Sequence, residues 1–166
     1  LLGVPGLTRA IRAGSVALAN AIGTGVADDK AVYRFVPEMI RYYLEEEPLL
    51  ANVKTYLLRD PEQLEHALER IDDLVFKPTN ESGGKGVFVG PSATDEEVQR
   101  QRELTLRDPA RWIAQEVVHL STAPTVAPDG SLVPRHVDLR PFAVFGTEVR
   151  VTSVDVVPQP PPHPHP

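Results

Sequence analysis

Apolar positions along the chain follow the helical period in some segments and the strand period in others. Helical spacing predicts four helices, at residues 7–13, 28–44, 61–72 and 95–107. Asp28, Asp60 and Thr94 are the expected N-caps of the last three, and Glu97 completes a capping box with Thr94. Pro37 stands inside the second helical pattern and should kink or split it, because proline lacks the backbone donor that a helix interior needs.

Strand patterns occupy the segments between these helices. Short apolar or alternating runs predict strands at residues 15–20, 53–58, 74–78, 86–90, 112–118, 135–144 and 149–157. Helices and strands therefore alternate, so the predicted fold class is α/β, with antiparallel hairpins in the middle of the chain. The Pro/His tail, residues 158–166, is expected to be extended or disordered.

Composition narrows the classes of function. The chain has 166 residues, 42% of them hydrophobic, which suffices for a packed core. The net charge of -6 argues against a nucleic-acid partner, since such proteins carry a basic face. Without cysteine, there is no disulfide scaffold, thiol nucleophile or Cys-based zinc site. No apolar run approaches the roughly 20 residues that span a bilayer, so no membrane partner is expected and the location is predicted to be cytoplasmic.

A glycine-rich stretch, residues 77–87, carries the strongest chemical signal. Its glycines allow a tight loop whose backbone N–H groups approach an anion, and Lys77 lies on the incoming strand. The loop joins two strands, so it does not match a P-loop, which opens a helix. It is either a hairpin that folds over phosphates or a plain flexible hairpin.

Polar residues on two other predicted strands, and a lysine at a helix start, add to this signal. Gln115 and Glu116 lie on the strand at 112–118, where one of them could bind the amino group of adenine. An edge strand that carries polar residues would show the same sequence pattern. Lys30 begins a helix, where its positive charge is unfavourable because the helix dipole is positive at that end. The side chain either contacts an anion or is simply exposed to solvent. Alternation places three polar side chains on one face of the strand at 135–144, which suits anion binding or a solvated outer face: His136, Asp138 and Arg140.

Six short motifs, in order and at family-like spacing, resemble the circularly permuted ATP-grasp family of bacteria over about residues 1–150. They stand at residues 2–7, 20–26, 75–78, 83–87, 114–116 and 135–142. The resemblance implies a two-lobed ATP-grasp fold with a mixed or antiparallel sheet in its small lobe. The large lobe would take residues 1–52 and 119–157, and the small lobe, with its phosphate loop, residues 53–118.

The resemblance also implies roles for individual residues. Lys30 and Lys77 match lysines that contact nucleotide phosphates, and Arg140 matches a catalytic residue that faces the γ-phosphate or the acyl phosphate. His136 and Asp138 match the same motif and are candidates for substrate binding. The remaining matches bind ATP, either as a lid over the phosphates or as the adenine hinge: Gly83, Gly84, Gly86, Gln115, Glu116 and Val117.

The implied activity is that of an ATP-dependent carboxylate–amine ligase acting through an acyl phosphate. Mg²⁺ is expected for the family, but its acidic ligands would lie before Leu1, so no metal ligand is assigned. The ending after residue 150 is unlike the family, and we expect a fragment incomplete at both ends, either truncated or frame-shifted. The alternative is a non-catalytic nucleotide-binding or interaction module that keeps the fold only. A metal site of His136, His163 and His165 is a weaker third reading, because the tail gives it no rigid framework.

Overall fold

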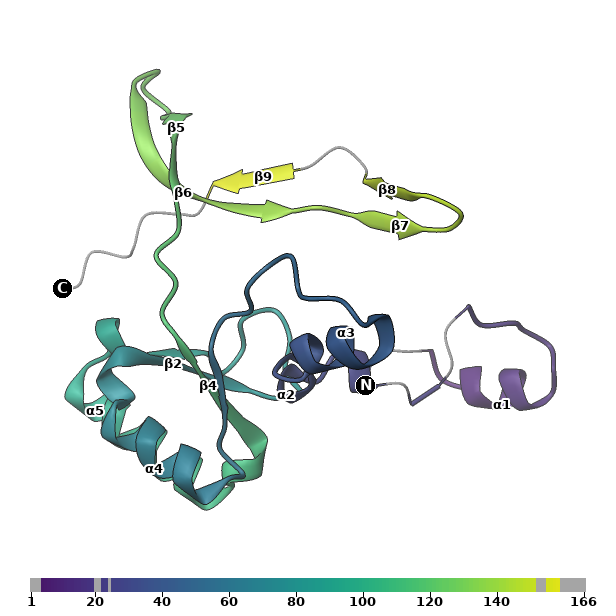
Figure 1. Ribbon diagram of the computed structural model, residues 1–166, viewed down its shortest axis with the longest axis horizontal. Helices are drawn as coiled ribbons and strands as arrows, with labels where there is room; N and C mark the ends of the chain where they lie inside the picture. The colour runs from purple at the N-terminus through teal and green to yellow at the C-terminus, as the bar shows by residue number, and fades with distance from the viewer. Residues whose placement is uncertain (1–3, 20–21, 24, 152–154, 159–166) are drawn as a thin grey trace. The chain divides into compact units, whose positions relative to one another are not determined.

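The computed structural model describes residues 4–19, 22–23, 25–151 and 155–158 (Figure 1). The contacts divide the chain into two units, Leu1–Val117 and Val118–Pro166.

The N-caps predicted from the sequence begin two of the helices. Helix α4 (Pro61–Glu69) starts behind Asp60, whose carboxylate accepts from the backbone N–H groups of Glu62 and Gln63 at 3.0 and 3.2 Å. Helix α5 (Asp95–Arg107) starts with the expected capping box between Thr94 and Glu97. These side chains satisfy backbone donors that have no partner inside the helix.

Pro37 splits the predicted helix over residues 28–44. Helix α2 (Lys30–Tyr33) is one short turn, and α3 (Val36–Leu44) begins with the proline in its first turn, where no intrahelical N–H bond is required. The N-cap of α2 is Asp29, one residue later than predicted, and its Oδ1 accepts from Ala31 N at 2.8 Å.

Helix α1 (Leu7–Arg12) explains why the strand predicted over residues 15–20 is wrong at its described positions. Gly14, at φ +69°, donates its N–H to Ile11 O, and Ser15 donates to Ala10 O at 2.9 Å. These two bonds are the Schellman closure of the helix, which uses the backbone that a strand would need. Asn20 lies outside the described residues.

The first unit contains a four-stranded antiparallel sheet in the order β1-β4-β2-β3. Its strands are β1 (Thr55–Leu57), β2 (Leu74–Pro78), β3 (Phe88–Val89) and β4 (Trp112–Glu116). The glycine-rich stretch joins β2 and β3, which confirms that it connects two strands. Short 3-10 turns complete the unit: η1 (Gly25–Ala27), η2 (Ile71–Asp73), η3 (Gly90–Ser92) and η4 (Pro109–Arg111).

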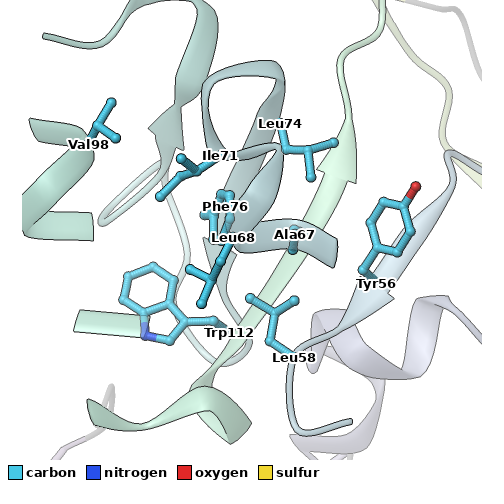
Figure 2. Close-up of a cluster of buried hydrophobic side chains, with 10 residues drawn as sticks. Tyr56, Leu58, Ala67, Leu68, Ile71, Leu74, Phe76, Val98 and Trp112 are labelled. Atoms are coloured by element: carbon cyan, nitrogen blue, oxygen red, sulfur yellow. The ribbon is translucent and has the colours of Figure 1, made fainter. Parts of the chain in front are cut away.

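Helices α4 and α5 cover one face of this sheet, where the core lies (Figures 1 and 2). Phe76 and Leu74 of β2 are completely buried there, and Trp112 and Ala114 of β4 join them. Gly90 is required beside this core, because a Cβ atom at that position would lie 2.2 Å from the carbonyl oxygen of Ile71. Helix, sheet and core together confirm the α/β class.

The second unit consists of antiparallel strands: β5 (Thr122–Val126), β6 (Leu132–Arg140), β7 (Ala143–Phe145), β8 (Val149–Val151) and β9 (Asp155–Pro158). β6 pairs with β5 and β9, and β7 pairs with β8. The single strand predicted over residues 135–144 is wrong, since Pro141 and Phe142 separate β6 from β7. None of the described side chains of this unit is buried.

Candidate functional site

Three polar side chains from neighbouring strands meet on the sheet face opposite the core. Side chains alternate along a strand, so Lys77 of β2, Gln115 of β4 and Thr55 of β1 all point away from α4 and α5. Lys77 Nζ donates to Gln115 Oε1 at 2.7 Å, and Gln115 Nε2 donates to Thr55 Oγ1 at 2.8 Å. Thr55 and Gln115 are buried, at 4% and 8% exposure. The strand order thus assembles a buried polar row ending on an ammonium group.

Lys30 brings a second positive charge to Lys77. The Lys30 backbone N–H donates to Thr79 O at 3.0 Å, and its Nζ donates to the carbonyl oxygen of Glu81, so α2 begins against the segment that follows β2. Burial lowers the pKa of Lys77, and the charge of Lys30 lowers it further. Among the residues that the structure describes, no carboxylate pairs with either lysine. Two adjacent cations without a counter-ion suit an anionic ligand.

The glycine-rich loop stands beside these lysines on a fixed base. Glu81 is held from two sides, because its carbonyl oxygen accepts from Lys30 and its carboxylate pairs with Arg111 at 3.3 Å. Beyond it, Gly83, Gly84 and Gly86 all have positive φ, of +65°, +76° and +69°. This left-handed backbone favours glycine. A Cβ atom at Gly83 or Gly84 would meet nothing within 4 Å, so the loop tip is open to an approaching ligand.

Glu116 points to the opposite face from Gln115. Its carboxylate accepts from Arg70 Nη1 and Nη2 at 2.8 and 3.0 Å and from the Tyr56 hydroxyl at 2.6 Å. These bonds, led by those from Arg70, lower the pKa of Glu116 to about 2. The carboxylate therefore ties β4 to β1 and α4. Val117 follows directly as the last residue of the first unit. The adenine contacts assigned to residues 115–117 stay a prediction.

The other predicted residues lie on β6 in the second unit. Alternation along that strand places His136 and Asp138 on one face. His136 Nδ1 lies 2.9 Å from Leu120 O, which places a proton on Nδ1. Asp138 and Arg140 stand opposite Val157 and Asp155 in the register with β9. The side chain of Arg140, like His163 and His165, lies outside the described residues.

Sequence reasoning missed three side chains that shape the site. Thr55 ends the polar row, Arg111 holds the base of the glycine loop, and Arg70 binds Glu116. The first two depend on the strand order and on the position of η4, neither of which the sequence reveals. The position of Glu116 could have been found, because neighbouring residues of a strand face opposite sides.

Clusters of metal-binding side chains and membrane-spanning helices are both absent from the part of the chain that the structure describes. There, no three His, Cys, Asp or Glu side chains gather where they could hold a metal ion. No step is therefore assigned through Mg²⁺. Among the same residues, no helix is both long enough and apolar enough to cross a membrane.

The first unit thus combines an antiparallel sheet with a glycine-rich hairpin loop, two adjacent lysines and a polar strand. The family described as circularly permuted ATP-grasp type 2 matches residues 1–157. The chain belongs to this family, so the family named from the sequence motifs is confirmed.

Several curated relatives share half of their aligned residues with this chain. A Frankia alni protein named "Putative glutamate--cysteine ligase 2-3" is 53% identical over 144 residues, 87% of this chain and 17% of the relative. Uncharacterised proteins of Synechocystis and Mycobacterium tuberculosis (strain H37Rv) are 54% and 52% identical over 152 residues, 91% of this chain and 31% and 27% of those relatives. The chain therefore spans less than a third of the length of these relatives.

Proposed function

We propose that this chain carries the ATP-binding part of a carboxylate–amine ligase that works through an acyl phosphate. The observation that supports this most is the pair Lys77 and Lys30, which has no carboxylate partner among the described residues. A half-buried ammonium beside another cation is unfavourable until an anion arrives. Nucleotide phosphates would supply that anion.

In the proposed reaction, the substrate carboxylate attacks the γ-phosphorus of ATP, which forms an acyl phosphate and releases ADP. The amine then attacks the acyl carbon, the C–N bond forms, and inorganic phosphate leaves with its bonding electrons while the amine loses a proton. Such chemistry depends on positioning and charge neutralisation rather than on a protein nucleophile. The printed name of the Frankia alni relative, a glutamate–cysteine ligase, supports this class of reaction.

Each residue has a role consistent with its chemistry. Lys77 and Lys30 would neutralise phosphate oxygens, and the backbone of Gly83, Gly84 and Gly86 would close over them. The strand end at residues 115–117 would hold adenine. On the second unit, Arg140 would stabilise the transferred phosphoryl group, and His136 and Asp138 would contact substrate. The cytoplasmic location stays a prediction, and no particular carboxylate or amine is assigned.

The test is a calorimetric titration of the chain with ATP, with and without Mg²⁺, beside the variant Lys77→Met. Removing one charge-assisted phosphate contact should weaken binding about tenfold to a hundredfold. Lys54→Met is the matched control, because Lys54 lies on the other face of the sheet, with Nζ 5.1 Å from the Tyr56 ring centroid. Equal affinity in wild type and Lys77→Met would contradict the proposed site.

An assay of ADP release by the same chain distinguishes a ligase from a non-catalytic module. ADP release that requires an added carboxylate and amine would support the ligase. Nucleotide binding by this chain with no ADP formed, across a panel of carboxylates and amines, would favour a module that only binds.

A further inference from the structure

The hydrogen bonds that join Lys77, Gln115 and Thr55 allow only one assignment of donors and acceptors. Lys77 Nζ can only donate, so the amide oxygen of Gln115 must face it, as the 2.7 Å contact has it. The amide nitrogen then faces Thr55 Oγ1 at 2.8 Å and needs an acceptor there. The single hydroxyl proton of Thr55 is used elsewhere, because Oγ1 donates to Val53 O at 2.9 Å. Its lone pair is thus free to accept from Gln115.

We propose that Thr55 is a positioning residue of the nucleotide site, which fixes the Gln115 amide so that its oxygen holds the Lys77 ammonium ready for phosphate. This inference rests on the proposed function. Thr55 does not itself touch the nucleotide; it acts through Gln115. The residue falls in no family motif that the sequence presents, and only the register Thr55↔Gln115 brings the two together.

Because Gln115 is buried, both ends of its amide group need a hydrogen-bond partner from the protein. The amide of Gln115 has two polar ends, and at 8% exposure water cannot replace a lost partner freely. With a valine at position 55, the amide nitrogen would lose its acceptor. The side chain would then either keep an unpaired N–H group in place or move away and release Lys77. Either outcome makes the lysine less well ordered before the nucleotide binds.

The same row continues to the helix that carries Lys30. Val53 accepts from Thr55 through its carbonyl oxygen, and its N–H donates to the Tyr33 hydroxyl at 2.9 Å. Asn52 Nδ2 also donates to Tyr33 O at 2.9 Å. Tyr33 ends α2, whose first residue is Lys30. These hydrogen bonds therefore link Thr55 to Tyr33, which lies on the same short helix as Lys30.

The experiment compares Thr55→Val, which keeps shape but loses the hydroxyl, with Thr55→Ser, which keeps the hydroxyl. Thr105→Val is the matched control, because Thr105 is also fully buried and accepts from Gln101 Nε2 at 3.0 Å, but on α5. Calorimetry gives the Kd for ATP. The NMR shift of the Lys77 Cε carbon, followed against pH in the nucleotide-free protein, gives the pKa of Lys77.

We expect Thr55→Val to raise the Kd for ATP by about threefold to tenfold, the effect of one hydrogen bond. The pKa of Lys77 should fall further, since the ammonium loses its fixed acceptor while the charge of Lys30 remains nearby. Thr55→Ser and Thr105→Val should match the wild type in both measurements. If Thr55→Val does not fold, Gln115→Leu should lower the pKa of Lys77 in the same direction.

Two results would overturn the inference. One is a folded Thr55→Val protein with wild-type Kd and wild-type Lys77 pKa, and the other is failure of Thr55→Ser to restore them. Should the wild type itself bind no ATP, the proposed function fails. The pKa of Lys77 in the free protein then decides alone whether Thr55 positions the lysine.

Discussion

Glu116 offers a quantitative test of what holds the end of β4 in place. Replacing it with glutamine keeps the shape and leaves an acceptor for Tyr56, but it removes the charge that Arg70 binds with two N–H groups. The variant therefore measures the charged part of the interaction. We expect Glu116→Gln to fold and to be less stable than the wild type at neutral pH.

The magnitude follows from the pKa of Glu116, which is lowered from 4.5 to about 2. A difference of this size corresponds to about 3 kcal/mol of stability if the pair were fully shielded from water. The side chains of Arg70 and Glu116 are 34% and 31% exposed, so solvent screening reduces the value. We expect a loss of about 1–2 kcal/mol in the free energy of unfolding at pH 7.

The direction of the pKa shift also predicts how the stability contribution of Glu116 changes with pH. Because the pKa of Glu116 is lower in the folded than in the unfolded chain, its contribution is complete above about pH 5 and is lost as the pH falls from 4.5 towards 2. Urea unfolding of wild type and Glu116→Gln should therefore show a difference that shrinks by more than about half between pH 7 and about pH 3. Glu65→Gln, at an exposed position of α4, is the control and should change little.

Two results would refute this reasoning. Equal stability of wild type and Glu116→Gln at pH 7 would mean that the ion pair contributes nothing. A difference that stays the same down to about pH 3 would mean that the loss comes from shape or packing rather than from the carboxylate charge.

Two further predictions concern the core and the lysine pair. Gly90→Ala should lower the free energy of unfolding by about 2 kcal/mol or more, because its Cβ would lie 2.2 Å from Ile71 O. Gly146→Ala, where a Cβ would meet nothing within 4 Å, should cost less in the same urea titration. Binding of ATP should weaken as the pH rises through the lowered pKa of Lys77, since only the ammonium form attracts phosphate, and titrations from about pH 7 to about pH 10 should show the decline. An affinity that is constant over this range would exclude Lys77 from phosphate binding.

The features that the sequence predicts well are those set by neighbouring residues. Asp60 and Thr94 cap their helices because a cap needs only the next three residues, and Pro37 splits its helix for an equally local reason. Local patterns also produced the errors. Residues 15–19 look like a strand, but Gly14 and Ser15 close helix α1. Strand β5 was not predicted, since Pro124 is unfavourable within a strand pattern.

The features that the sequence does not predict are those that need distant residues. Lys77 and the glycine loop could be named from their motif, but the order β1-β4-β2-β3 decides that Thr55 lies beside Gln115. The same order gives Arg111 its position against Glu81. The sequence alone does not identify these partners, because they depend on the pairing register of the strands. A shift of one residue in that register would turn each side chain to the other face of the sheet.

We propose above that nucleotide phosphates bind beside Lys77 and Lys30, and chemical labelling of the lysines tests this directly. Lysine stands at positions 30, 54, 77 and 85, so an ATP analogue that carries an acyl group on its terminal phosphate can report which amines lie near the phosphates. Mass spectrometry of the treated full chain locates the transferred acyl group. We expect labelling at Lys77 or Lys30 that excess ATP suppresses, with Lys54 unaffected. Labelling that is equal at Lys54 and Lys77, or that ATP does not reduce, would contradict it.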